Sequence, residues 1–259
     1  MSALSYIKQQ IIIGLTSRAE YRFSFFLFIF LSVVLGFLSI FVTYAVYDAT
    51  GGGVPGWSFY EITFMIGVYT FIRGIYEMFF VIRYMPGEIR RGDLDMDLTK
   101  PLNLLTLYVR FDIDNIGRLI TAFLMFWIAV PNINLQLSLF NILYFIFLVI
   151  IGLLAMFAVD LFVITFAFFV TNVNSIQNNL DNIRSRFCRW PMNLYPKSMQ
   201  LFFTFVFPII FIGFVPASFF LGKEIIFAYW LSPIIVIILT LLSIKWFYYG
   251  VAKYTGTGS

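Results

Sequence analysis

Residues 83–114 read RYMPGEIRRGDLDMDLTKPLNLLTLYVRFDID, and this stretch decides how the rest of the chain is arranged. The chain of 259 residues has 17 basic and 13 acidic side chains, and eleven of these thirty lie here. The sequence on either side is apolar enough to fill a membrane. The stretch, which we call the polar island, must therefore lie in water between two membrane-spanning segments.

The composition is that of an integral membrane protein. The chain is 61% hydrophobic and only 12% charged, about half the charged fraction of a soluble domain. Its mean hydropathy is +0.92, and runs of 18 or more apolar residues recur along it. We expect an all-α integral membrane protein that forms one transmembrane domain over residues 1–259.

The apolar runs predict six membrane-spanning helices. They are residues 23–46, 60–82, 116–130, 139–170, 201–221 and 228–249. The fifth run contains Pro208, Gly213 and Pro216, and Pro216 should end or kink a helix because proline lacks the amide donor. We therefore expect the fifth span to be followed by a re-entrant piece on the outer side, over residues 214–222.

Residues 1–22 have apolar side chains at helical spacing among charged ones, which predicts an amphipathic helix lying in the membrane interface. A frayed polar start is the alternative. Under the six-span topology, fifteen of the 17 basic residues fall on the side of the polar island. Only Lys223 falls outside, and Arg73 lies within a span. This bias predicts a multi-pass protein of the cell membrane with both termini in the cytoplasm.

Several function classes are excluded by what the sequence lacks. It has no histidine and a single cysteine, Cys188, which excludes histidine catalysis, the common zinc sites and an internal disulfide. No phosphate loop, HExxH or GxSxG motif is present, so we expect no enzyme and no cofactor or metal site in this chain. The net charge of +4 is attributed to topology, so we expect no nucleic-acid partner.

Three charged residues fall within the predicted spans. Arg73 and Glu77 are four residues apart and can pair on one helix face. Arg73 lies ten residues, or about 15 Å of helix, before Arg83 and so should be inside the apolar core. The pair either forms a polar lining on a substrate path or at a subunit interface, or it fixes helix packing. Asp160 should lie close to the cytoplasmic interface, where a solvated carboxylate is favoured over a proton relay.

The polar island alternates charged and apolar residues between Pro86 and Pro101. Its apolar members are Ile89, Leu94, Met96 and Leu98. A short amphipathic element of this kind can dock a soluble partner, because charge sets the register and an apolar ridge supplies burial. It can equally be a solvated connector whose acids keep it out of the membrane.

Five stretches of the sequence resemble the ABC-2 type exporter permeases, and closest is the branch of uncharacterised ABC transport permeases. They are AEYRFSF (19–25), RRGDLDMDLTKPLN (90–103), RFDIDNIGRL (110–119), WPMNLYPKSMQ (190–200) and VPASFFLG (215–222). Together they cover essentially the full chain in order.

The resemblance implies a six-helix permease of the type V exporter kind. It implies an amphipathic N-terminal connector helix, a cytoplasmic coupling loop over residues 83–114, and a re-entrant break that includes Pro216 and Gly222. The coupling residues would be Glu88, Ile89, Arg90, Arg91, Asp93, Leu94, Asp95 and Asp97. Members of this branch resemble half-permeases that pair with a like or unlike permease and with two ATPase subunits, which hold the ATP and Mg²⁺.

We therefore expect the permease subunit of an ATP-binding cassette exporter that carries an amphiphilic, lipid-, peptide- or drug-like substrate. The alternatives are an ion-coupled secondary carrier, using Arg73, Glu77 and Asp160 as coupling groups, and a membrane scaffold without transport.

Overall fold

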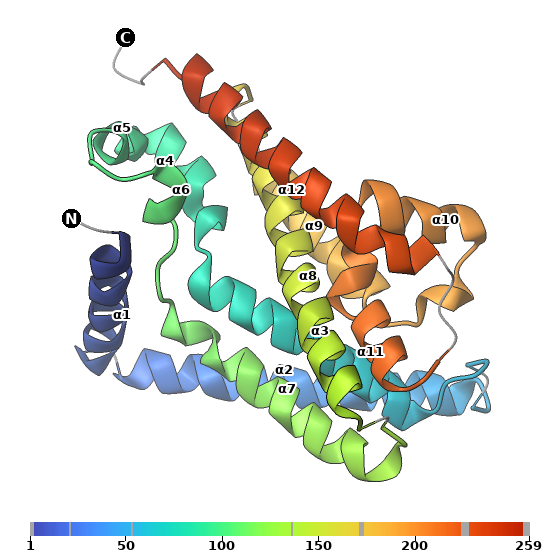
Figure 1. The fold of residues 1–259 in the computed structure, drawn as a ribbon. Coiled ribbons are helices and arrows are strands. Elements are labelled where there is room, and N and C mark those ends of the chain that lie inside the picture. The colour runs from blue at the N-terminus through green and yellow to red at the C-terminus, as the bar shows by residue number, and fades with distance from the viewer. Residues whose placement is uncertain are drawn as a thin grey trace.

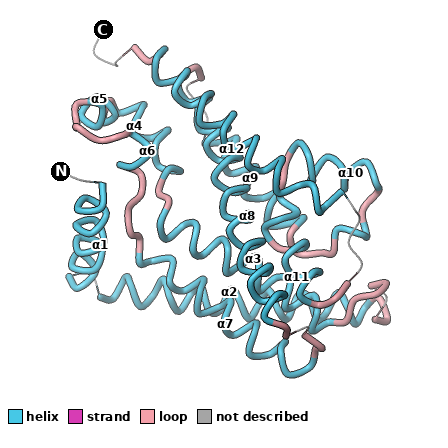
Figure 2. The backbone as a smooth tube through the Cα atoms, viewed as in Figure 1, coloured by secondary structure: helices cyan, strands magenta, loops and turns pink. Residues whose placement is uncertain are grey.

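The computed structural model describes residues 3–20, 22–52, 54–135, 137–170, 174–223 and 228–255, and within them nearly all regular structure is helical. Figure 2 shows this backbone as helices joined by loops and turns. The α-helices are α1 (Ala3–Glu20), α2 (Arg22–Ala49), α3 (Phe59–Phe79), α4 (Met85–Arg91), α5 (Asp93–Leu98), α6 (Leu104–Leu107), α7 (Ile116–Ala129), α8 (Leu139–Ile164), α9 (Asn174–Phe187), α10 (Lys197–Leu201), α11 (Phe214–Phe220) and α12 (Ala228–Lys253). Shorter 3₁₀ and π turns extend several of them.

Five of the described helical segments are long and apolar enough to cross a membrane. They are Arg22–Ala49, Phe59–Phe79, Ile113–Asn132, Leu139–Phe168 and Pro233–Lys253. The expected all-helical membrane class is confirmed, and these segments correspond to five of the six expected spans. The remaining expected span, the fifth in chain order over residues 201–221, is not one continuous helix.

The polar island folds against both ends of the chain (Figure 1). The Tyr6 hydroxyl of α1 donates a hydrogen bond to the carbonyl of Leu107, at 3.1 Å. The Tyr248 hydroxyl near the end of α12 donates to the side chain of Asn103. We call this the island end of the bundle. The helix expected over residues 1–22 is present as α1, although residues 1, 2 and 21 lie outside the described residues.

The helix α3 is the most deeply buried of the five membrane-length segments. It begins with a reciprocal cap in which Glu61 accepts from the Ser58 amide at 2.7 Å and donates its own amide to the Ser58 hydroxyl at 3.3 Å. It ends at Phe79, because Phe80 pairs with Val109 of the island instead of continuing the helix. The helix therefore ends three residues earlier than the sequence predicted, and its last turn is fixed to the island.

The helix α2 is the least buried of the five membrane-length segments. Its main described contact with the bundle is a stripe on α7, where the Thr121 hydroxyl donates to the carbonyl of Ser32 at 3.2 Å. At its far end Tyr44 and Tyr47 also pack on Phe59 of α3. Most of its large apolar side chains are exposed, among them Phe23, Phe30 and Phe41. An apolar helix face of this kind is stable only against lipid or another protein.

The segment after α8 takes a different course from the one expected. The expected spans 139–170 and 201–221 would leave residues 171–200 as one loop at the island end. Instead α9 packs beside the last turns of α8, where Leu180 joins Val159 and Val163 in one apolar cluster. The chain then runs to the opposite end of the bundle, where the Tyr229 hydroxyl near the start of α12 donates to Gln200 at 3.2 Å.

Residues 201–221 then enter the bundle, reverse direction inside it and leave it again on the side from which they entered. The turn at Ile209–Ile212 is buried and reaches the middle of α8, where the Phe211 carbonyl would lie 2.7 Å from a Cβ added at Gly152. Pro216 does not end or kink a helix as expected: it lies in the first turn of α11, whose amide groups need no partner within the helix. The break precedes it, at Pro208 and Gly213.

Gly222 follows α11 with a positive φ of 66°, a conformation that favours glycine and ends the helix. The buried setting of Ile209–Ile212 matches the rule that irregular backbone lies at membrane depth only when protein covers it. Whether residues 214–222 face the outer side of a membrane stays a prediction.

Candidate functional site

Residues 85–98 of the polar island fold as two short helices, α4 and α5, which together we call the island hairpin. Pro86 lies in the first turn of α4, and Gly92 joins the two helices with a φ of 79°, in the left-handed region. Ile89 and Leu94 point inward and are buried in an apolar cluster with Leu107 and other neighbours. The hairpin is therefore a packed element and not a loose connector.

The inner side of the hairpin also holds two of its acids. Glu88 accepts a hydrogen bond from the buried Tyr108 hydroxyl and lies 3.7 Å from Arg110. Asp97 is bound by Lys100 at 2.5 Å and lies 3.8 Å from Arg110. Burial, and then the bond to Glu88, raises the pKa of Tyr108 well above its ordinary value, so it remains a donor at all physiological pH.

The outer side of the hairpin is a mixed charged and apolar surface. Its members are Arg90, Arg91, Asp93, Asp95, Met96 and Leu98. Arg91 binds Asp93 at 2.7 Å, and Met96 is 66% exposed. The eight residues expected to couple to an ATPase therefore divide. Arg90, Arg91, Asp93 and Asp95 are accessible, and the two arginines also lie at the pocket described below, whereas Glu88, Ile89, Leu94 and Asp97 hold the hairpin together. The prediction that Ile89 and Leu94 belong to an exposed apolar ridge is wrong, because both side chains are buried in the core.

Next to the hairpin lies a group of ion pairs that we call the charge cluster. It consists of Arg73, Glu77, Arg83, Arg118, Asp160, Asp181 and Arg184. Its centre is Glu77, whose carboxylate is buried. Glu77 lies 2.6 Å from Arg73, 2.8 Å from Arg118 of α7 and 3.4 Å from Arg83. The expected Arg73–Glu77 pair is present, and it belongs to a larger group.

The second centre of the cluster is Asp181 of α9. Arg73 lies 3.4 Å from it, Arg83 lies 3.5 Å from it, and Arg184 lies 3.5 Å from it. Because Arg83 directly precedes the hairpin, its contacts join the hairpin to α3 and α9. The 15 Å separation expected between Arg73 and Arg83 assumed one unbroken helix; α3 ends at Phe79, so the Arg83 side chain folds back to Glu77.

Asp160 of α8 is paired with Arg184 of α9, so the expectation of a freely solvated carboxylate is wrong. Arg184 is only 2% exposed, whereas its sequence context placed it in a solvated loop. Burial opposes the charge on Arg184, but the carboxylates of Asp160 and Asp181 outweigh it and hold its pKa above the ordinary value. A buried charge of this kind is stable only while its partner remains.

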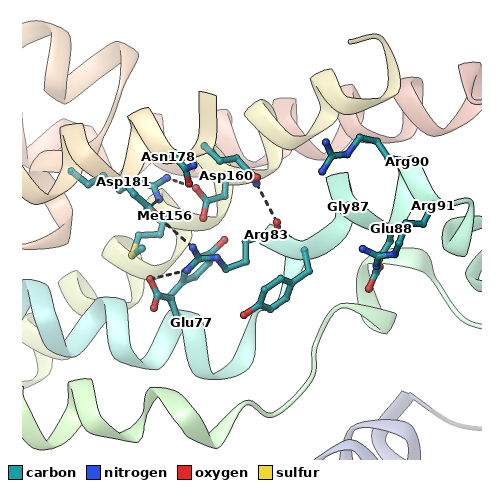
Figure 3. A pocket seen from close by; sticks show the side chains of 14 residues that line it. Glu77, Arg83, Gly87, Glu88, Arg90, Arg91, Met156, Asp160, Asn178 and Asp181 are labelled. Carbon is teal, nitrogen blue, oxygen red and sulfur yellow. Dashed lines mark hydrogen bonds and ion pairs between the residues drawn. The ribbon is translucent and has the colours of Figure 1, made fainter. Parts of the chain in front are cut away.

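A pocket of about 540 Å³ lies between the hairpin and the charge cluster. Figure 3 shows Glu77, Asp160 and Asp181 on one side of it and Arg90, Arg91 and Glu88 on the other. Tyr76 and Arg184 also line it, and each is only 2% exposed. The pocket therefore lies where α3, α4, α8 and α9 meet.

The described residues contain no group of three or more His, Cys, Asp or Glu side chains placed to hold a metal ion. Sequence reasoning missed Asp181, Arg184 and Arg118 as members of the cluster. The spacing of Asp181 and Arg184, three residues apart, is a local signal for that pair alone. No local signal links them to the rest, since Arg184 meets Asp160 across 24 residues and Arg118 meets Glu77 across 41. Only the packing of four different helices brings them together.

Membrane-length helices joined at one end to a packed, charged hairpin define a polytopic membrane protein. The model of the family described as ABC-2 family transporter protein matches residues 10–258, and the chain therefore belongs to this family. It is an ABC transporter permease. Such chains are normally the non-catalytic membrane subunit, and the family implies association with an ABC ATPase. No curated protein and no solved structure matches the chain.

Proposed function

We propose that this chain is the permease subunit of an ATP-driven exporter and that the ATPase docks on the outer side of the island hairpin. The observation that supports the proposal is the difference between the two sides of the hairpin. Its inner side is packed on apolar residues of the bundle and ion-paired to Arg110 of the island, and its outer side leaves Arg90, Arg91, Asp93 and Met96 accessible. A rigid element with an accessible outer face can transmit force from a partner.

The charge cluster supplies a physical route for that force. Arg83 precedes α4 and lies within 3.5 Å of both Glu77 and Asp181. Glu77 in turn binds Arg118 of α7, and Arg184 joins α9 to Asp160 of α8. In the proposed cycle, ATP binding closes the ATPases, the hairpin moves, and the linked helices reorient to give alternating access.

The proposed complex contains two ATPase subunits, which hold ATP and Mg²⁺, and a second permease that is identical or unlike. The exposed apolar face of α2 supports contact with lipid or with that second permease. We propose the cell membrane as the location, with the island end and both termini in the cytoplasm. The basic residues concentrated in the island and both terminal segments support this orientation.

An amphiphilic substrate, of the lipid, peptide or drug-like class, fits the apolar surfaces of the bundle. A groove of about 380 Å³ lies between α8, α12 and the turn at residues 206–208, and its walls include Phe162, Leu242 and Trp246. A groove of this size and polarity can hold an acyl chain or an aromatic group. An ion-coupled carrier is less well supported, because Glu77 and Asp160 are already bound by arginines.

The test is a pull-down from native membranes with the charges of the outer face reversed, in the variant Arg90→Glu/Arg91→Glu/Asp93→Lys. We expect recovery of a phosphate-loop ATPase to fall at least about tenfold, because like charges now meet across the docking surface. Membrane insertion should be unchanged, since none of the three side chains is buried.

The matched control is Arg186→Glu/Arg189→Glu, which reverses two exposed arginines outside the island. It should retain the ATPase. If the triple variant assembles with its ATPase and hydrolyses ATP like the parent, the docking role of the hairpin is wrong. Transport by the chain alone, driven by an ion gradient and indifferent to ATP, would overturn the exporter proposal itself.

A further inference from the structure

The helix α9 has a buried side and a polar, exposed side. Leu180 and Arg184 lie on the buried side, which packs on α8. The exposed polar residues lie on the opposite side at helical spacing, and we call them the α9 polar face. They are Asn178, Asn179, Asn182 and Arg186, and Arg189 continues the face just after the helix ends. The two arginines of this face make no ion pair with any other described residue.

The contacts of the buried side fix the level of α9 along the bundle. Arg184 is paired with Asp160 of α8, which lies eight residues, or about 12 Å of helix, before the membrane-length segment ends at Phe168. Farther along, the Cys188 thiol donates to the carbonyl of Ile209 at 3.7 Å, in the turn that reaches the middle of α8. The helix α9 therefore runs from the island end to about the middle of the membrane-length part of the bundle.

At the same level, the surface formed by α12 is apolar. Phe162 and Ala158 of α8 share a groove with Leu242 of α12, so these residues lie at the level of Asp160. The neighbouring Leu241 is 57% exposed, as expected of a side chain that faces lipid. The α9 polar face thus presents amide and guanidinium groups at a depth where α12 presents leucine.

Lipid cannot cover the α9 polar face, because amide and guanidinium groups at this depth would lose their hydration without gaining a partner. A second copy of this chain is also a poor cover. A symmetric contact through this face would bring Arg186 and Arg189 close to the same two arginines of the other copy. Water fits, because Asn178 belongs to this face and also lines the pocket at the island end, whose wall includes the exposed Arg90 (Figure 3).

We propose that the α9 polar face lines a water-filled vestibule, which enters the membrane-length part of the bundle from the island end. Water in the vestibule solvates Asn182 and Arg186 at a depth where lipid surrounds α12. The vestibule is a property of this chain and requires neither an ATPase nor transport. Its use as the path for the polar group of a transported amphiphile rests on the proposed function.

The test measures how fast a charged, water-soluble methanethiosulfonate reagent labels an introduced cysteine in the full-length chain. Labelling is done without ATP in membrane fragments whose two faces are both open to the reagent, and the labelled fraction is measured by mass spectrometry. Asn182→Cys and Arg186→Cys should react at least about tenfold faster than the matched control Leu241→Cys, because neither the reagent nor a thiolate enters hydrocarbon. The parent chain is the blank, since Cys188 is buried. All three introduced thiols should react fully in SDS.

Sealed vesicles test the direction of entry. Lys253→Cys, at the exposed end of α12, reports that the reagent reaches the island end, and Asp48→Cys, at the far end of α2, reports that it reaches the other. Asn182→Cys should be labelled only in vesicles in which Lys253→Cys is labelled. The proposal is overturned if Asn182→Cys and Arg186→Cys react no faster than Leu241→Cys, or if they are labelled from the Asp48 side. Neither result bears on ATPase docking, because the assay contains no ATP and does not measure transport.

Discussion

At the residue scale, the helices are joined by carboxylates, and the central ones form ion pairs with arginines from several parts of the chain. Glu77 contacts Arg73 of its own helix, Arg83 next to the hairpin and Arg118 of α7. Such groups are costly to bury and become stable only when the partners are present together. The identity of these residues therefore fixes how α3, α7, α8 and α9 meet.

The Arg184–Asp160 pair provides a direct test of this view. Replacing Arg184 by methionine leaves the Asp160 carboxylate inside the bundle without its closest partner, and we expect the free energy of unfolding to fall by about 3 kcal/mol. The double variant Arg184→Met/Asp160→Leu should recover most of that loss, because it removes the unpaired charge as well. Unfolding by SDS in mixed micelles measures both.

The control for this prediction is Arg186→Met, which makes the same change at an exposed position of the same helix and should alter stability little. A double variant no more stable than Arg184→Met would show that the pair does not act as a buried unit.

The sequence predicts contacts at this scale only where they are local. Arg73 and Glu77 are recognisable as a pair because four residues separate them on one helix. Arg184 looks like a solvated loop residue because its neighbours in sequence are polar, and Asp160, the carboxylate that makes its burial possible, is distant in the chain. The composition of the polar island likewise gives no information on which of its apolar residues face inward.

At the scale of elements, the five membrane-length segments follow from hydropathy and length, and the segment between α8 and α12 does not. Residues 201–221 are apolar enough to be taken for a span. Pro208 and Gly213 break that run, and Pro216 lies in the first turn of α11, where its missing amide has no cost. An apolar composition indicates that a segment is buried, but it does not show whether the segment crosses the bundle or turns back within it.

The close contact at Gly152 tests the position of this turn. A glycine-to-alanine change within a helix ordinarily stabilises it by about 0.5–1 kcal/mol. At Gly152 the new Cβ would lie 2.7 Å from the Phe211 carbonyl, so we expect Gly152→Ala to lower the free energy of unfolding by about 1–3 kcal/mol. The same SDS unfolding assay measures it.

Gly87→Ala in α4 is the matched control, because the nearest atom to its Cβ is the flexible end of Arg91, at 3.3 Å. It should be neutral or slightly stabilising. If Gly152→Ala is as stable as Gly87→Ala, residues 209–212 do not pack against the middle of α8.

At the scale of the whole molecule, ion pairs of Arg83 and apolar packing join the island hairpin to a membrane bundle. Membership of the ABC-2 family establishes a transport permease. The site on which a partner would act is proposed from the hairpin, whose inner residues hold it to the bundle and whose outer residues remain accessible. The central claim is that the outer face of residues 85–98 contacts an ATPase.

The chain is well suited to site-directed cross-linking. Its single cysteine, Cys188, is buried, and burial raises the pKa of this thiol to about 12, so it should not react near neutral pH. A cysteine introduced at the exposed Met96 would then be the reactive thiol of the island, and one introduced at the exposed Asp48, at the far end of α2, is the matched control.

The most direct measurement is therefore cross-linking from Met96→Cys in native membranes, with the captured protein identified by mass spectrometry. The account predicts an adduct between Met96→Cys and a phosphate-loop ATPase, and none from Asp48→Cys. An introduced thiol at residue 96 that reacts with small reagents but never captures an ATPase, or captures it no more than the thiol at residue 48, would contradict it.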